Sequence, residues 1–390
     1  MNKFTLLSIA LLLLAIALRS EVVGMVAIAL GAAVLLSRVW IRSIERSLKI
    51  KRTIPHTIAF GDEITIHTTI TNQSLLRVPW IEVRDSVALG LRRGTPPHAV
   101  FTLAPHEQHL LSYVVRGTRR GWFGVGPLTI RSGDVLGLQR IRLNVAPLYV
   151  TVLPRVVPIE ALGLPALLSF GPLRPQGIRR RSEDPARPAG VRQYVPGDDV
   201  RRLDWKSSAR QSALLVRRAE PTIAPETMVV LAFGRGDYPA SVLQDALERA
   251  ATVAASIGVA LLGRKLPVGL ITNGYDPLRD LQGLSLALGK GDGQRQLLLA
   301  TLGRLGAGQD RALFDLIRQQ QLAWGGTVVL IIADLTIELL PDLLALRRRG
   351  QQIVVLLVEG TSQGLMLAQQ QHVAAYRVDP RGAMVPERSR

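Results

Sequence analysis

The segment Val191–Arg210, "VRQYVPGDDVRRLDWKSSAR", gathers residue types that could do chemistry. It contains three aspartates and five cations, together with a tyrosine and a tryptophan. Three carboxylates could bind a divalent cation or act as a general acid and base. However, the cations outnumber the carboxylates and would compete for them. No histidine lies between His109 and His372 to serve as a nearby base.

The same segment also suits a structural role. Proline and glycine followed by two aspartates are typical of a turn. Arg–Asp pairs would hold the chain on both sides of that turn, with Tyr194 and Trp205 as the buried apolar mass. Because a partly buried charge is costly unless it is paired, we favour a clamp or an interface over a reaction centre. The residues assigned to it are Arg192, Tyr194, Pro196, Gly197, Asp198, Asp199, Arg202, Asp204, Trp205, Lys206 and Arg210.

The N-terminus carries two apolar runs, which predict a transmembrane helical hairpin over residues 1–45. Phe4–Leu18 and Val22–Ser37 are uncharged, and each is slightly shorter than the roughly 20 residues that span a bilayer. Cations follow the second run closely, which predicts two passes of the inner (cell) membrane with the bulk of the chain in the cytoplasm. The alternative for the first run is a signal peptide, since Ala15-Ile16-Ala17 has the small-x-small cleavage form.

Residues 53–154 have the pattern of an all-β, immunoglobulin-like sandwich. The stretch "EITIHTTITN" alternates apolar and polar residues, and further short runs are separated by Gly, Pro and Asn turn signals. Residues 155–225 are rich in proline and arginine, which predicts a linker that carries the segment described above. Within this linker, Arg179–Gly190 is expected to form an exposed loop.

Residues 226–378 predict an α/β, Rossmann-like domain, and residues 379–390 a tail. Continuous apolar runs alternate with amphipathic helices, as in a parallel sheet that is covered on both faces. The expected strands are Thr227–Phe233, Leu266–Asn273, Gly326–Asp334 and Gln351–Glu359. Gly289–Gly293 lacks the order of a phosphate-binding loop and is expected to precede a helix. No cofactor is predicted.

The charge balance indicates an anionic neighbour. The chain has 48 basic and 30 acidic residues, a formal net charge of +18, which suits nucleic acid, anionic lipid or an acidic partner protein. Aromatic residues make up 5% of the chain, fewer than a base-stacking surface needs, and many cations follow the apolar runs. Membrane lipid is therefore favoured over nucleic acid. The absence of cysteine excludes disulfides, thiolate metal sites and cysteine nucleophiles.

The segment from Arg192 to Arg210 resembles the signature of the bacterial family called domain of unknown function 58, approximately R-E-Y-x-P-G-D-D-x-R-x-I-D-W-K-x-x-A-R. Arg116–Leu138 is similar to the run that closes the family's sandwich. The resemblance implies two membrane segments, a sandwich and a C-terminal part like a von Willebrand factor type A domain. It also implies a non-enzymatic adaptor that binds partner proteins, with a MoxR-type AAA+ ATPase, in protein assembly or maturation.

The chain departs from that family and from type A domains at specific positions. Type A domains often carry D-x-S-x-S after the first strand to hold a metal, but Ala232, Gly234 and Gly236 stand at those places. No metal is therefore expected there, since Asp334 alone cannot hold a hard cation. Gln193 also replaces the glutamate of the signature.

Two other classes of function stay open from the sequence. One is a membrane protein that binds nucleic acid through its surplus cations. The other is an enzyme that uses Asp198, Asp199 or Asp204 in acid–base or metal chemistry.

Overall fold

The computed structural model describes residues 3–91, 97–158, 183–195, 203–211, 213–221, 226–309, 312–320, 322, 325–378 and 384–385. The chain divides into two compact units, Met1–Pro154 and Arg155–Arg390.

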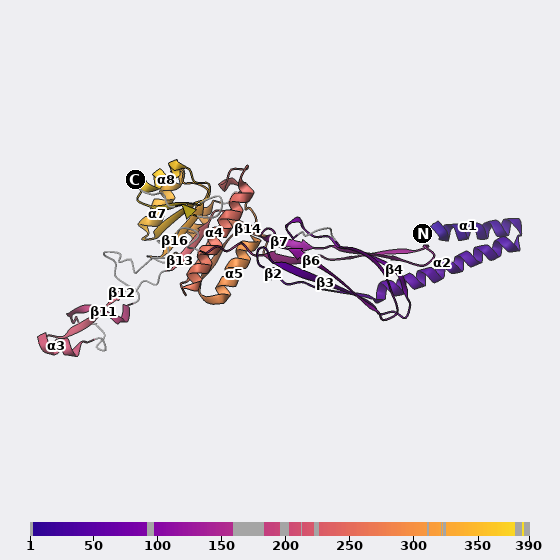
Figure 1. The fold of residues 1–390 in the computed structure, drawn as a ribbon, viewed down its shortest axis with the longest axis horizontal. Helices are drawn as coiled ribbons and strands as arrows, with labels where there is room; N and C mark the ends of the chain where they lie inside the picture. The colour runs from indigo at the N-terminus through magenta and orange to yellow at the C-terminus, as the bar shows by residue number, and fades with distance from the viewer. Residues whose placement is uncertain are drawn as a thin grey trace. The chain divides into compact units, whose positions relative to one another are not determined.

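The first unit begins with two apolar helices, α1 (Lys3–Leu18) and α2 (Glu21–Ser47), that pack against each other as a hairpin (Figure 1). Small residues line the contact: a Cβ on Gly24 would lie 3.8 Å from the Cβ of Ala15, and one on Gly31 would lie 3.8 Å from Ser8 Oγ. Long apolar side chains point outward along both helices. Small residues inside and leucines outside are typical of helices packed in lipid. Helix α2 is long and apolar enough to be a candidate membrane span, whereas α1 is a shorter apolar helix.

The rest of the first unit is a β-sandwich. Its strands are β1 (Leu48–Thr53), β2 (Thr57–Ile58), β3 (Glu63–Asn72), β4 (Val78–Arg84), β5 (His98–Leu103), β6 (Gln108–Arg116), β7 (Gly121–Val125), β8 (Leu128–Gly133), β9 (Arg140–Val145) and β10 (Leu148–Val152), with a short 3-10 helix η1 (Leu89–Leu91). The described strands form three sheets, β1-β3-β6, β2-β10-β7 and β5-β4-β8-β9. The predicted all-β region is confirmed.

Strand β3 contributes to two core clusters that follow each other along its length. The cluster that includes the end of helix α2, here called the near cluster, contains Ile70 of β3 with residues of β4, β5 and β8. The other, here called the far cluster, contains Ile66 of β3 and Leu91 of η1, together with residues of β2, β7 and β10. The sheet β1-β3-β6 therefore packs on one neighbouring sheet at one end and on the other sheet at its opposite end.

Helix α2 ends inside the near cluster of the sandwich. Ile41 and Ile44 of the helix are buried there with Leu48, the first residue of β1. No loop separates the helix from this strand, because α2 ends at Ser47. The sequence pattern ends the helical hairpin at residue 45 and begins the sandwich at residue 53, whereas in the structure α2 runs to Ser47 and residues 48–53 pair with β3. The hairpin and the sandwich thus share one hydrophobic core.

The second unit contains a mixed sheet in the order β15-β14-β13-β16-β17-β18-β19. Strands β13, β14, β16, β17 and β18 run parallel to their neighbours, whereas β15 and β19 are antiparallel. The strands are β13 (Thr227–Leu231), β14 (Val268–Asp276), β15 (Leu281–Gly289), β16 (Thr327–Ile332), β17 (Gln352–Leu357), β18 (Ala374–Val378) and β19 (Met384–Val385). Every residue of β16 is buried, so both faces of the sheet are covered, as predicted.

Helices connect these strands. They are α4 (Leu243–Gly263), α5 (Gly291–Arg304), α6 (Leu313–Gln319), α7 (Leu340–Arg348) and α8 (Ser362–Gln370), with 3-10 helices η4 (Arg235–Asp237) and η5 (Ile337–Leu339). Helices α4 and α5 lie side by side, while α7 contacts β17 and α8 contacts β18 (Figure 1). Helix α4 is also long and apolar, but 67% of its apolar window is buried. It is therefore a core helix of this unit.

The sequence pattern missed three strands of this sheet. Strand β15 pairs with β14 in an antiparallel hairpin, although only about half of its residues are buried or partly buried. Strands β18 and β19 end the sheet, and β18 is half exposed. Strands β15 and β18 lack the continuous apolar run by which buried parallel strands are identified, and β19 has only two residues, which is why the three were not predicted.

Candidate interaction site

The signature segment forms a hairpin of β11 (Glu183–Gln193) and β12 (Leu215–Pro221) with the short helix α3 (Trp205–Gln211) between them. The exposed loop predicted over Arg179–Gly190 is therefore wrong for residues 183–190, whose backbone pairs with β12. Register shifts interrupt the ladder on both sides of Pro188. Proline is tolerated at such irregularities because it has no N–H to donate. Pairing with a strand some 25 residues away cannot be seen in local composition.

A small core holds this hairpin together. Leu203, Leu215 and Val216 are buried, and Leu203 pairs with Val216 in an isolated bridge. The Oγ of Ser208 on α3 accepts a hydrogen bond of 2.8 Å from Leu215 N. The backbone N–H of Asp204 donates to Leu215 O at 2.8 Å. These hydrogen bonds tie helix α3 and the residue before it to β12 at Leu215.

Asp204 caps the start of α3. Its Oδ1 accepts a hydrogen bond of 3.1 Å from Ser207 N, and its carbonyl oxygen accepts one of 2.9 Å from Ser208 N. Aspartate is a favoured residue at this position because its side chain satisfies an N–H that has no partner within the helix. A helix cap was not foreseen for this carboxylate, which the sequence pattern assigned to an Arg–Asp pair.

The tryptophan of the signature is exposed, contrary to the prediction. Trp205 is 65% exposed, and Tyr194 is half-buried. Among the described side chains of the hairpin, the buried apolar ones are Leu203, Leu215 and Val216. The predicted buried apolar mass is therefore wrong for Trp205.

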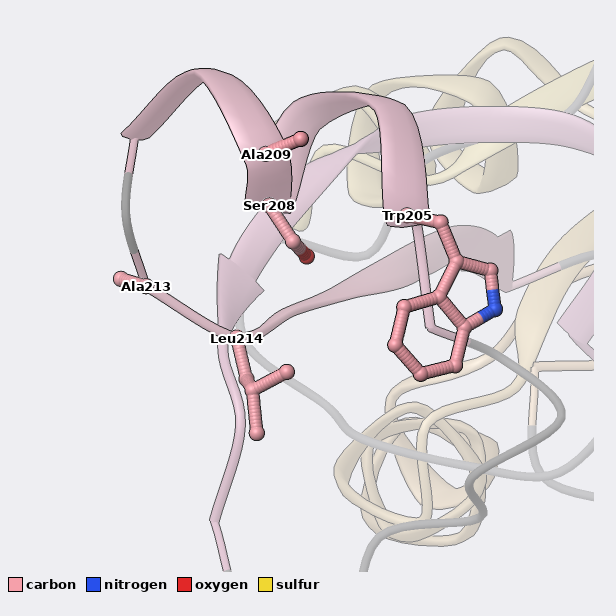
Figure 2. A pocket seen from close by; sticks show the side chains of 5 residues that line it. All are labelled: Trp205, Ser208, Ala209, Ala213 and Leu214. Atoms are coloured by element: carbon pink, nitrogen blue, oxygen red, sulfur yellow. The ribbon is translucent and has the colours of Figure 1, made fainter.

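Trp205 stands beside a shallow apolar hollow of about 300 Å³. Figure 2 shows Trp205, Ser208 and Ala209 of α3 facing Ala213 and Leu214 of the segment that leads into β12. Leu214 is 49% exposed. Lys206 and Arg210 on the same helix are also exposed. The result is an apolar surface with cations beside it, which could receive an apolar side chain from an acidic partner.

The remaining signature residues cannot be placed. Pro196, Gly197, Asp198, Asp199 and Arg202 lie outside the described residues, as does the side chain of Arg192. The Arg–Asp pairs expected among them stay a prediction.

A second candidate is the carboxyl end of the parallel sheet, where open α/β sheets bind ligands. Ala232, Gly234 and Gly236, the positions at which the sequence pattern was compared with a metal-binding motif, follow β13. Asp237 Oδ2 accepts hydrogen bonds from Gly234 N at 2.7 Å and from Asn273 Nδ2 at 2.8 Å. Asn273 Oδ1 in turn accepts one from Phe233 N at 2.7 Å. The loop is thus closed by its own side chains.

Packing around Gly234 leaves no room for a ligand-bearing side chain. A Cβ at this position would lie 2.9 Å from both Asp237 Oδ2 and Asn273 Nδ2, closer than real Cβ contacts. Among the residues that the structure describes, no group of three or more His, Asp and Glu side chains could hold a metal ion.

Asp334 and Tyr238 are engaged at the same end of the sheet. Asp334 Oδ2 accepts a hydrogen bond of 2.6 Å from Thr361 Oγ1, and Thr361 Oγ1 accepts one from Gly364 N at the start of α8. Tyr238 donates its hydroxyl to Ala232 O at 3.0 Å. Tyr238 is buried, and this burial raises the pKa of its hydroxyl. The polar groups here are used to join strand ends.

Asp237, Asn273 and Thr361 were not foreseen as parts of this network. Asn273 closes the expected strand "LITN", and a polar residue at a strand end was the available signal. No such signal marked Asp237. Its hydrogen-bond partners come from β14 and from its own loop, and these meet only in the folded sheet.

One sequence family matches part of the second unit. Residues 190–281 match the family described as "Protein of unknown function DUF58". The DUF58 match thus begins in β11 and runs through β12, β13, α4 and β14. The motif that suggested the resemblance lies within it.

A curated relative is similar to part of the chain. The chain is 25% identical over 248 residues to "Uncharacterized protein YeaD" of Bacillus subtilis (strain 168), across 60% of this chain and 57% of that protein. The match therefore spans a little over half the length of the relative.

Two solved structures each resemble about a quarter of the chain. Native alpha-2-macroglobulin from Escherichia coli is 20% identical over 28% of this chain and 17% of its own, with a TM-score of 0.25. The CARDB domain of a Pyrococcus furiosus protein is 19% identical over 27% of this chain and 85% of its own, with a TM-score of 0.20. Likenesses this weak say nothing about what the DUF58 segment does.

Proposed function

We propose that this chain is a membrane-anchored, non-enzymatic adaptor that binds a partner protein through the DUF58 hairpin of β11, α3 and β12. The observation that carries the proposal is the exposed indole of Trp205 beside the apolar hollow. Tryptophan is enriched among the residues that dominate protein–protein affinity, since it buries much area at little entropic cost. Because Trp205 is exposed rather than part of the hairpin's own core, a partner protein could bury it.

The membrane anchor is the α1–α2 hairpin. Its small-residue contact and outward leucines support packing in lipid. Arg42, Arg46 and Lys49 follow the apolar part of α2, and this charge supports a cytoplasmic location for everything after it. The anchor is proposed to cross the inner membrane twice.

The α/β part is proposed to be Rossmann-like, in the manner of a type A domain. When β13 to β18 are numbered 1 to 6 in chain order, they lie in the sheet in the order 3-2-1-4-5-6. This is the strand order of doubly wound folds. Its loops would contact a protein without a metal, because Asp237 and Asn273 occupy the place of the metal-binding loop. The partner suggested by the family resemblance is a MoxR-type AAA+ ATPase acting in protein assembly or maturation.

Affinity purification of the tagged full-length chain from native membranes tests this function. Trp205→Ala is compared with Ile337→Ala, which truncates another exposed apolar side chain of the same unit. We expect an AAA+ ATPase to co-elute with the wild type and with Ile337→Ala but to be lost with Trp205→Ala. Equal recovery with both variants would exclude the hairpin as the binding surface, and an eluate without any AAA+ ATPase would exclude that partner.

A further inference from the structure

One end of the β-sandwich carries apolar side chains on two tight loops. Loop 73–77 joins β3 to β4, and turn 134–139 joins β8 to β9. Leu75 is 82% exposed, Val135 72% and Leu136 68%. Single exposed apolar residues are ordinary on protein surfaces. We call these three side chains the apolar tips, because they share one end of the same sandwich.

Both loops lie at the end where helix α2 enters the sandwich. Gln73 N donates to Ser47 O, the last residue of α2, at 2.9 Å. Ser132 Oγ donates to Trp80 O at 2.7 Å, and a Cβ on Gly133 would lie 2.8 Å from the Trp80 ring. The turn after β8 therefore sits beside the start of β4, next to loop 73–77.

Each loop is held rigidly by a buried polar side chain. Asn72 Nδ2 donates to Leu76 O and to Ala104 O, both at 2.9 Å. Ser74 Oγ donates to Asn72 Oδ1 at 2.6 Å. In the turn, Asp134 Oδ1 accepts a hydrogen bond of 2.7 Å from Gln139 N. The loops thus present the apolar tips outward from a fixed backbone.

The position of α2 places loop 73–77 at the level of lipid headgroups. Arg38 is the first charged residue after the apolar part of α2, and its Nη2 donates to Thr5 Oγ1 near the start of α1 at 2.8 Å. Trp40 follows two residues later, about 3 Å along the helix axis, and its Nε1 donates to Arg77 O at 3.3 Å. Since each headgroup layer is about 5–7 Å thick, loop 73–77 falls within it.

We infer that the apolar tips insert into the membrane interface and hold the sandwich against the bilayer. The inference rests on the proposed membrane anchoring. Exposed cations flank the tips, Arg77 beside Leu75 and Arg140 beside the turn, and both suit anionic headgroups. Together with the shared core of α2 and the sandwich, this gives the first unit one orientation on the membrane.

Single cysteines test the inference, because the chain contains no native cysteine. Leu75→Cys and Leu136→Cys are each introduced into the full-length chain, labelled with the fluorophore NBD and reconstituted into nanodiscs of phosphatidylcholine and phosphatidylglycerol. Leu89→Cys serves as the matched control, since Leu89 is an exposed leucine of η1 beside the far cluster. Ile28→Cys, exposed on α2, reports the anchor itself.

We expect labels at 75 and 136 to be quenched by spin-labelled lipid and protected from aqueous iodide, and the label at 89 to behave in the opposite way. If the label at 28 is quenched by lipid while those at 75 and 136 are quenched only by iodide, the insertion is overturned and the anchor stands. If the label at 28 is also quenched only by iodide, both are overturned.

Discussion

The DUF58 hairpin and the carboxyl end of the α/β sheet use their polar residues differently. At the sheet end, Asp237, Asn273 and Asp334 are hydrogen-bonded to neighbouring loops and strands. In the hairpin, Asp204 caps a helix of seven residues, and the largest apolar side chain, Trp205, is exposed.

The difference separates two surfaces that look equally promising from general rules. The carboxyl end of an open α/β sheet is the usual binding place, yet here its loops are closed by internal hydrogen bonds. The hairpin has little core of its own and keeps an apolar surface outside. We therefore propose this densely charged segment as a binding surface because of its exposed Trp205 rather than because of its charges.

The largest effect is expected from breaking the buried ion pair at the end of β14. Arg304 donates through Nε and Nη2 to the two oxygens of Asp276 at 3.2 Å, and Asp276 is fully buried. Arg304→Met should lower the free energy of unfolding by about 3–5 kcal/mol, because it leaves a buried carboxylate without its partner. Arg318→Met, which removes an exposed pair with Asp315, should cost less than about 1 kcal/mol. Denaturant unfolding of the second unit gives the free energy of unfolding of both variants. Equal losses of stability would contradict the prediction that the buried ion pair contributes more than the exposed one.

Truncating the exposed tryptophan should weaken partner binding without unfolding the protein. We expect Trp205→Ala to reduce affinity by about 2 kcal/mol or more, as for a residue at the centre of an interface. The thermal unfolding midpoint should stay unchanged, because the indole packs little within the hairpin. Titration of the purified partner against each variant gives the affinity. A large drop in the midpoint would mean that Trp205 is structural after all.

Removing the carboxylate of Asp237 should lower stability and leave partner binding unchanged, the reverse of what we expect for Trp205→Ala. Asp237→Ala leaves Gly234 N and the Asn273 amide without their acceptor, which we expect to cost about 1–3 kcal/mol. Partner affinity should be unaffected. Hydrogen exchange of peptides around β13 and β14 reports the loss locally. If Asp237→Ala lowers affinity but not stability, the binding surface is the sheet end and not the hairpin.

A smaller effect is expected from the cap of α3. Asp204→Ala should destabilise the hairpin by about 0.5–2 kcal/mol, because Ser207 N loses its acceptor. Asp204→Asn keeps an acceptor at the same place and should be close to wild type. Hydrogen exchange of β12 distinguishes the two variants. An asparagine variant as impaired as the alanine variant would indicate that the charge of Asp204 is needed.

The smallest effect at neutral pH should come from the hydroxyl of Tyr238. Burial raises its pKa in the folded state, while the unfolded value is about 10. Above about pH 10 the unfolded chain loses this proton and the folded chain keeps it, so stability falls as pH rises. The stability that comes from the raised pKa of Tyr238 is fully present below about pH 10 and is lost as the pH rises through the folded pKa.

Tyr238→Phe should remove that alkaline slope and cost roughly 0.5–1.5 kcal/mol at neutral pH, through the lost bond to Ala232 O. Unfolding free energies measured from about pH 8 to 11 for both proteins give the difference. Identical slopes would show that Tyr238 is ionised equally in the folded and unfolded states.

Much of the fold could be predicted because its signals are local. The apolar runs of α1 and α2, the alternation in β3 and the continuous apolar strands β13, β14, β16 and β17 each lie within one short stretch. The helix expected after Gly289–Gly293 begins at Gly291. Strands β15 and β18 could not be found in this way, since neither contains a continuous apolar run.

For the site, the sequence by itself determined which segment is unusual and which residue types it contains. It also determined that the metal-ligating pattern after β13 is absent, because ligands are a matter of residue identity. Only the tertiary structure decided that Trp205 is exposed, that Asp237 and Asn273 close the sheet end, and that α2 shares a core with the sandwich. Burial depends on how much apolar surface distant segments bring to one place, and no local pattern contains that quantity.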